Sequence, residues 1–418
     1  MVGWLQIQLS LKMNVMDKVL PQQMESNWPE WFEHLKASWP SQAYSSESTQ
    51  LNIQPECEAW LAEHQSDEIY RIVWINGVLN VSCSSWPVLN ELDQVITTLP
   101  SYCMRSNEQT AWLKAYLEER SGWVQWLPNR AESLLNISDG ICIDLLRPLD
   151  RPLHLIHWVD ESIPSNHMTL QHMIRLGEGV SLDLCQWSVG SNPVSAEFNV
   201  DSHICLAEKA HLNISTIQQL PEGVTLRGLE TMCLDAHAQC QATYWGMGAS
   251  CFEQHTDIRL RGLHSHYALR ELIDLNGTQC QHHHVHVHHQ AESTDSQQTF
   301  CVLGQDRSKG QVLSRVIVDE GAFNIDSKQS ARGMLLSPGA QIEVSPELEI
   351  YADAVQCQHG ASVGALDADA LRYLTARGIS LDQAQQLLIQ ALIRNVLPDQ
   401  PNSKMHALMM KYYEFDEV

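Results

Sequence analysis

The sequence has no run of about 18 or more apolar residues, so it predicts no membrane-spanning helix. Positive charge is also scarce, because 26 Lys and Arg stand against 50 Asp and Glu, for a net charge of −24. A surface this acidic repels phosphate backbones and anionic lipids, so we expect neither a nucleic-acid partner nor a membrane partner. The opening stretch "MVGWLQIQLSLKMN" lacks a basic region, a continuous apolar stretch and a small-residue cleavage site, so we expect no signal peptide.

The twelve cysteines are scattered and form no C-x-x-C pair, which disfavours both a disulfide framework and a zinc finger. With no export signal expected, this spacing favours the reducing cytoplasm as the location. The sequence also lacks G-x-x-x-x-G-K-[ST], H-E-x-x-H and G-x-S-x-G, and its glycine-rich run "GMGASC" stands outside any βαβ pattern. We therefore expect no bound nucleotide and no catalytic machinery, and interpret the chain as a scaffold or binding subunit rather than an enzyme.

Hydrophobic periodicity divides the chain into regions 1–137, 138–365 and 366–418. The first region is predicted to be mainly helical, because "WPEWFEHLKASW" and "TAWLKAYLEERSGWVQWL" carry apolar residues at helical spacing. Between these two segments, "YRIVWINGVLNVS" is predicted to form a small hairpin. Its Asn76-Gly77 pair can adopt the positive φ angles that a tight turn needs.

The central region alternates apolar and polar residues in short segments between small-residue turns, as in "EKAHLNISTIQQL" and "PGAQIEVSPELEIYA". Gly-Ala pairs beginning at Gly321, Gly339 and Gly360 recur at 18 to 21 residues, which we interpret as one coil of a parallel β-helix. No long helical pattern intervenes, so an α/β sheet is not expected. The predicted fold class is mainly β, with a parallel β-helix core flanked by helical N- and C-terminal regions. A β-sandwich is the alternative.

The last region is predicted to begin with two helices. Asp367 can cap "ADALRYLTARG", which ends at Gly378. Ser380 and Gln383 then form a capping-box pattern at the start of "LDQAQQLLIQALIRNVL". This second helix carries an apolar face at helical spacing, which suits contact with a partner.

Six of the 20 histidines lie in the eight consecutive positions "HHHVHVHH". In a strand, four of them share one face: His282, His284, His286 and His288. His289 lies on the opposite face. Imidazoles on one face can share a zinc or copper ion if an adjacent strand supplies further ligands, so these five histidines form a candidate metal-handling strand. The alternative is a ladder of hydrogen-bonded imidazoles without metal.

A second candidate site lies in "VQCQHGASVG". Cys357 and His359 are two residues apart, so in a strand their side chains share a face. A soft thiolate beside an imidazole suits iron, an iron–sulfur species or zinc. Gly360 is predicted to let the backbone turn immediately afterwards. The alternative is a buried cysteine beside a hydrogen-bonded histidine.

The segment "PELEIYADAVQCQHGASVGALDADALRYLTARGI", residues 346–379, closely resembles the C-terminal signature of the SufD family, the D-type scaffold subunits of the SUF system for iron–sulfur cluster assembly. The resemblance continues more loosely through "GTQCQHHHVHVHHQAESTDSQQTF". It implies a right-handed parallel β-helix core in a non-enzymatic subunit that forms a heterodimer with a SufB-like paralogue and docks a SufC-like ATPase. The resemblance also implies a transient iron–sulfur cluster, or iron, shared with the partner scaffold subunit, and a part in iron acquisition.

The resemblance places specific residues. The family's candidate cluster or iron ligand falls on His359, and its neighbouring cysteine falls on Cys357. Asp353 and Gly360 are the supporting residues. The sequence departs from the family where an Asp-Asp pair is Asp353-Ala354 here, which removes one carboxylate next to the candidate ligands.

The family's ATPase-docking region falls on residues 367–396, where five leucines are candidate contacts: Leu371, Leu374, Leu387, Leu388 and Leu392. Three other interpretations stay open. The chain could be a SufB-like scaffold, although Cys357 is the only cysteine after Cys301, which favours the D type. It could be a histidine-rich metal-binding protein without partners. It could also be a β-helix enzyme acting on polysaccharide, although the lack of an expected secretion signal disfavours this.

Overall fold

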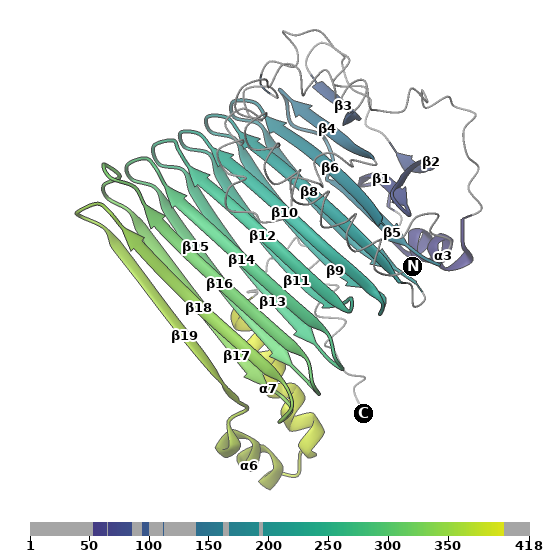
Figure 1. The fold of residues 1–418 in the computed structure, drawn as a ribbon, viewed down its shortest axis with the longest axis vertical. Helices are drawn as coiled ribbons and strands as arrows, with labels where there is room; N and C mark the ends of the chain where they lie inside the picture. Colours follow the sequence, from purple (N-terminus) through teal and green to yellow (C-terminus); the bar gives the residue numbers. More distant parts are fainter. Residues whose placement is uncertain are drawn as a thin grey trace, which may run out of the picture.

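The computed structural model describes residues 53–64, 66–85, 94–99, 112, 139–161, 167–191 and 195–396. Within these ranges the chain is mainly β and winds into a parallel β-solenoid, so the predicted β-helix fold is confirmed (Figure 1). Each coil contributes one strand to each of two sheets, which enclose a filled interior. The β-sandwich alternative was wrong, because the coils stack in parallel register, whereas sandwich sheets are antiparallel.

The two sheets contain ten and nine strands, and we call them sheet A and sheet B. In hydrogen-bonded order, sheet A consists of β19 (Gln356–Ala365), β17 (Asp326–Leu335), β15 (Asp295–Gly304), β13 (His266–Leu275), β11 (Gln239–Gly248), β9 (His211–Leu220), β7 (Ser181–Gly190), β5 (Leu153–Val159), β1 (Tyr70–Ile75) and β2 (Val78–Ser85). Sheet B consists of β18 (Gln341–Ile350), β16 (Lys309–Val318), β14 (Cys280–His289), β12 (Cys251–Leu260), β10 (Val224–Leu234), β8 (Ala196–Leu206), β6 (His167–Leu176), β4 (Asp139–Leu145) and β3 (Gln94–Thr98). The described helices are α3 (Pro55–Glu63), α6 (Ala368–Ala376) and α7 (Leu381–Val396), and none of them is long and apolar enough to cross a membrane.

The coil is longer than the sequence predicted. In sheet B, Cys280 pairs with Lys309, so one coil takes 29 residues at this point rather than 18 to 21. The Gly-Ala pairs at Gly321 and Gly339 lie at the two successive corners of a single coil, β16 to β17 and β17 to β18, whereas Gly360 lies inside β19. Their spacing therefore measures half-coils, which is why the prediction was wrong.

Inward and outward residues alternate along the strands, and burial follows this alternation most clearly in β16. In β16 every second residue is buried, and the inward set is Gly310, Val312, Ser314, Val316 and Val318. Period-two patterning places these side chains on one face, where they stack on the inward residues of the coils above and below. Each coil thus buries its apolar face only against its neighbours, so the last coil is left with one uncovered side.

The corners from sheet B to sheet A also stack. From the β6–β7 corner onwards, each carries a residue with positive φ near the start of the sheet A strand, in the order Gly179, Lys209, His237, His264, Ser293, Asn324 and Ala354. The backbone N–H of Asn324 donates to the carbonyl oxygen of Ala354 at 3.0 Å, which continues the ladder into the last corner. Asp is favoured over Ala in this left-handed conformation. The departure from the family's Asp-Asp pair therefore falls on a strained backbone position as well as removing a charge.

The predicted hairpin is confirmed at the other end of the solenoid. Asn76 has φ 50° and Gly77 has φ 79°, and β1 pairs antiparallel with β2. Strand β1 also pairs in parallel with β5, so this hairpin extends sheet A. The helical segments predicted elsewhere in residues 1–137 lie outside the described residues, apart from Trp112.

A second apolar core covers the outer face of sheet A. Leu61 of α3 and Leu392 of α7 both belong to it, and Trp60 of α3 packs against Trp158 and Trp187. Helix α7 contacts β13 and β15, and Figure 1 shows α6 and α7 beside the end of the solenoid that carries β19. Both ends of the described chain therefore return to the same sheet.

A pair of buried histidines makes the fold sensitive to acid. Nε2 of His157 lies 3.0 Å from Nε2 of His172, and the two rings stack inside the solenoid. Burial lowers the pKa of His172 to about 3, and burial together with the neighbouring ring lowers the pKa of His157 as well. The folded chain therefore holds both rings neutral where the unfolded chain binds protons.

We expect the free energy of unfolding to fall as the pH drops from 6.5 towards 3, because only the unfolded state takes up these protons. The His172→Gln variant removes one titrating ring and should flatten this slope by up to about 1.4 kcal/mol per pH unit. Urea unfolding at several pH values measures the slope. The exposed His211→Gln change is the matched control, and an equal slope in both variants would contradict the assignment.

Candidate functional site

Cys357 and His359 lie on β19, the last strand of sheet A. Cys357 pairs with Ser327 and His359 pairs with Gln329, and both of these partners on β17 point into the interior. Both candidate ligands therefore point towards the inside of the final coil. Among the described residues no further strand follows β19 in sheet A, so this inside is open on one side in that part of the chain (Figure 1).

The two side chains differ in exposure. His359 is exposed, whereas Cys357 is half-buried and packs against the interior core. Burial raises the pKa of the Cys357 thiol, and the carboxylate of Asp326 adds to the shift. Thiolates, not thiols, bind metal. Both effects favour the protonated form of the Cys357 thiol.

The two predicted supporting residues lie in different settings. Asp353 is exposed in the corner between β18 and β19, and within the described residues no hydrogen bond or ion pair joins it to His359. Gly360 does not turn the backbone, because β19 continues through it to Ala365, so that prediction was wrong. A side chain built at Gly360 would meet no atom within 4 Å. Gly360 therefore leaves the outer face of β19 without a side chain at this one position.

The open coil exposes apolar surface beside these ligands. On β18 the inward residues Ile342, Val344 and Leu348 are only partly covered, and Ile350 at its end is 40% exposed. On β19 Val363 is 44% exposed. Apolar side chains that would be core residues in any earlier coil are here in contact with solvent. Together with the unpaired backbone groups of two final strands, they form a surface that needs cover.

The histidine strand is β14, and its faces divide as predicted. Four histidines point outwards, His282, His284, His286 and His288, all partly buried. His289 points inwards, where Nδ1 lies 2.8 Å from Thr294 Oγ1 and Nε2 lies 2.9 Å from Ser296 Oγ. Burial lowers its pKa to about 4. Both of its ring nitrogens have hydrogen-bond partners, and its side chain lies on the opposite face of β14 from the four outward histidines.

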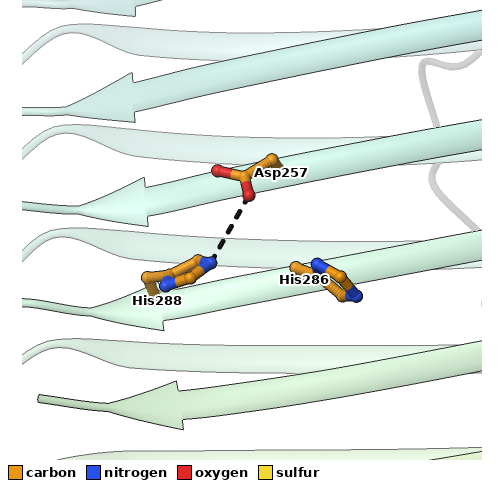
Figure 2. A group of neighbouring side chains, drawn as sticks. All are labelled: Asp257, His286 and His288. Carbon is orange, nitrogen blue, oxygen red and sulfur yellow. Dashed lines mark ion pairs between the residues drawn. The ribbon is translucent and has the colours of Figure 1, made fainter. Parts of the chain in front are cut away.

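Two of the outward histidines meet a carboxylate that the sequence reasoning missed. Asp257 on β12 pairs in register with His286, and its Oδ2 lies 3.4 Å from Nε2 of His288 (Figure 2). One ligand atom from each of the three residues lies within 4.8 Å of the others. The signal for Asp257 was present, because "CFEQHTDIRL" alternates like β14 one coil earlier. Finding it required the 29-residue coil length, which the sequence did not reveal.

The same outer face carries further ligand-type side chains in register. They are Cys251, Glu253 and His255 on β12, beside Cys280, His282 and His284 on β14. The rings of His255 and His284 stack at 4.7 Å, and Sγ of Cys280 lies 3.3 Å from Nε2 of His282. Burial and the neighbouring His255 lower the pKa of His284 to about 4, which keeps its ring neutral.

The C-terminal helices begin as predicted. The Asp367 side chain accepts from the N–H groups of Asp369 and Ala370, which caps α6. The N–H of Gln383 donates to Ser380 Oγ at 3.2 Å and the N–H of Ser380 donates to Gln383 Oε1 at 3.3 Å, which completes the capping box of α7. The local sequence alone specifies both starts.

The five leucines proposed for ATPase docking do not form one free face. Leu392 is only 6% exposed, because it packs into the core on the outer face of sheet A. Leu387 is 46% exposed on the solvent side of α7, and three others are partly buried: Leu371, Leu374 and Leu388. Leu392 is therefore a core residue, and Leu387 is the most accessible member of the set.

Comparison with known proteins agrees with this geometry. Residues 160–392, more than half of the chain, match the family model described as "SUF system FeS cluster assembly, SufBD core domain". The chain is 25% identical to the Escherichia coli protein named iron–sulfur cluster assembly protein SufD over 246 residues, 58% of this chain and 57% of that protein. It is 24% identical to the Bacillus subtilis protein of the same name over 218 residues, 50% of this chain and 48% of that protein.

A third relative, the chloroplastic protein ABCI7 of Arabidopsis thaliana, is 33% identical over 105 residues, 25% of this chain and 22% of that protein. The chain thus spans about half or less of the length of these relatives. The family match nevertheless covers the solenoid from the end of β5 into α7, including the last coil with Cys357 and His359. The chain therefore belongs to the SufBD family of iron–sulfur cluster assembly proteins.

Proposed function

We propose that this chain is a SufD-type, non-catalytic scaffold subunit of cytoplasmic iron–sulfur cluster assembly. It pairs with a SufB-like paralogue, docks a SufC-like ATPase and supports iron acquisition and formation of a nascent cluster. The observation that carries this proposal is the open last coil with Cys357 and His359 on its inward face.

The open coil suits a partner built in the same way. Strands β18 and β19 each present one unpaired edge, and exposed edges invite pairing with another chain. The uncovered apolar residues, including Ile350 and Val363, would be buried by the final coil of a paralogous solenoid. A paralogue with its own open coil would gain the same cover, so pairing end to end protects both chains.

The site is chemically incomplete without that partner. One imidazole and one thiol are fewer ligands than an iron–sulfur cluster or a tetrahedral metal ion takes, which is four. Exposed His359 can reach across the open end, and Cys357 lies two residues earlier on the same face of β19. A cluster or iron ion shared with partner ligands would complete the set. The chain handles it as cargo rather than as a resident cofactor.

Docking of the ATPase is proposed for the solvent side of α6 and α7. The Leu387→Asp variant should lower the affinity for a SufC-like ATPase at least about tenfold, because a charge would be buried in an apolar contact. The fold should be unaffected, since Leu387 is 46% exposed. Pull-down with the purified ATPase measures the loss. The Val81→Asp variant makes the same change on exposed β2 and serves as the matched control.

The Leu392→Ala variant distinguishes an effect on folding stability from an effect on ATPase docking. This residue is buried in the chain's own core, so its truncation should cost about 2–5 kcal/mol of stability.

If the Leu387→Asp variant binds the ATPase with unchanged affinity, the solvent side of α7 is not the docking surface.

Co-expression tests the proposed function as a whole. The full chain is expressed with a SufB-like subunit and a SufC-like ATPase, and the complex is isolated by a tag on this chain. We expect all three to elute together. If neither partner is retained, the scaffold assignment is contradicted.

A further inference from the structure

We propose that Asp257, His286 and His288 bind a divalent transition-metal ion on the outer face of sheet B. This site lies on the side wall of the solenoid, on β12 and β14, and is separate from the open coil that carries His359 (Figures 1 and 2). It does not depend on the proposed function, because it is complete within this chain.

The geometry is close to that of a three-ligand site. The ligand atoms lie within 4.8 Å of one another, and Asp257 Oδ2 and His288 Nε2 are 3.4 Å apart. Metal–ligand bonds of about 2.0–2.2 Å place neighbouring ligand atoms roughly 3 to 3.6 Å apart. The Asp257–His288 pair is already at that separation. Figure 2 shows His286 beside this pair on the same strand as His288, and one of its ring nitrogens lies within 4.8 Å of the ligand atoms of the other two.

The donor set selects the class of ion. Two imidazoles and one carboxylate with open positions suit Fe²⁺, Co²⁺ or Zn²⁺, whereas Ca²⁺ and Mg²⁺ prefer oxygen ligands. The side chains of Asp257 and His288 are 24% and 19% exposed, so an ion can enter from solvent yet stays partly shielded from water.

Neighbouring charges orient the carboxylate without filling the site. The Arg259 Nε–H donates to Oδ1 of Asp257 at 3.2 Å, which leaves Oδ2 directed at His288. Arg315 lies beside His286 on β16, but its guanidinium is engaged by Glu347 at 2.6 Å and by Glu349 at 3.3 Å. The charge of Arg315 is therefore partly neutralised, and that of Arg259 is paired with Asp257 itself.

The competing explanation is a simple ion pair between Asp257 and a protonated His288, within a ladder of imidazoles that has no defined metal site. In that case metal would bind weakly and diffusely along β14, and every outward histidine would contribute alike. The two explanations differ in whether His282 contributes as much to metal affinity as His288.

Cobalt titration of the purified full chain, freed of metal with EDTA and kept reduced without oxygen, tests the proposal. We expect one Co²⁺ to bind with a visible absorption band lacking a thiolate charge-transfer band, and Zn²⁺ to displace it. The Asp257→Asn and His288→Ala variants should each weaken binding at least about tenfold. The matched control is His282→Ala, on the same face of β14 but outside the trio, and it should change affinity by no more than about twofold.

Equal losses in His282→Ala and His288→Ala, or no loss in the Asp257→Asn variant, would overturn the proposal. A second measurement needs no variant. Diethyl pyrocarbonate labelling of the wild-type chain, read by mass spectrometry, should show Zn²⁺ protecting His286 and His288 but not the exposed corner residue His264. Equal labelling with and without Zn²⁺ would also overturn it.

Discussion

Replacing His359 by alanine is expected to abolish cluster formation on the assembled complex while leaving the complex intact. His359 is exposed on the last strand, so its removal should change folding stability by no more than about 0.5 kcal/mol. It is also the side chain best placed to reach a cluster shared across the open end. Removing one ligand from a shared set leaves iron with an open position and a weaker hold, so we expect at least about a tenfold loss of cluster.

Iron and acid-labile sulfide in the anaerobically purified complex measure this effect. The Gln358→Ala variant is the matched control, because Gln358 is next to His359 on β19 but points to the opposite face. Normal iron and sulfide in the His359→Ala complex would contradict the assignment of His359. Loss of the partner subunit in that variant would show that His359 acts in assembly instead.

The second large effect is expected from a charge in the open coil. The Val363→Asp variant places a carboxylate among the apolar inward residues of the last strands, where pairing with a SufB-like subunit would bury it. An unpaired buried charge typically costs about 3–5 kcal/mol, so the affinity between the scaffold subunits should fall by at least about a hundredfold. The isolated chain should tolerate the change, since Val363 is 44% exposed there.

Analytical ultracentrifugation or calorimetry with the purified partner measures this affinity. The Val81→Asp variant controls for an added charge on an exposed strand, because β2 lies at the far end of the solenoid (Figure 1). A heterodimer of normal affinity with the Val363→Asp chain would contradict end-to-end pairing through β18 and β19.

Features set by local sequence were predicted well. The Asn76-Gly77 turn, the Asp367 cap and the Ser380–Gln383 capping box all formed as expected, because each depends on residues within four positions. The two faces of the histidine strand followed from alternation alone. These features need no knowledge of which strands become neighbours.

Features set by long-range register were not predictable. Asp257 meets His286 only because the coil takes 29 residues there, and the glycine spacing had indicated a shorter coil. Leu392 was predicted to contact a partner from the apolar face of its helix, yet it is buried because α7 lies on sheet A. Gly360 continues a strand because β17 offers it a parallel partner. In each case a contact distant in sequence overrides the local pattern.

The structure places the two candidate metal sites in different parts of the solenoid. Cys357 and His359 lie at the open end, where a partner could supply further ligands. Asp257, His286 and His288 lie on a side wall, with one ligand atom of each within 4.8 Å of the others. The first arrangement suits transient cargo shared between subunits, and the second suits an ion held by this chain alone.

The measurement that tests the central claim most directly is anaerobic isolation of the tagged chain from its native cell extract. Co-purified proteins are identified by mass spectrometry, and iron and sulfide are quantified. We expect a SufB-like subunit and a SufC-like ATPase, together with iron and acid-labile sulfide. Recovery of the chain alone, carrying metal ions but no sulfide, would contradict the scaffold function and would favour a histidine-rich metal-binding protein without partners.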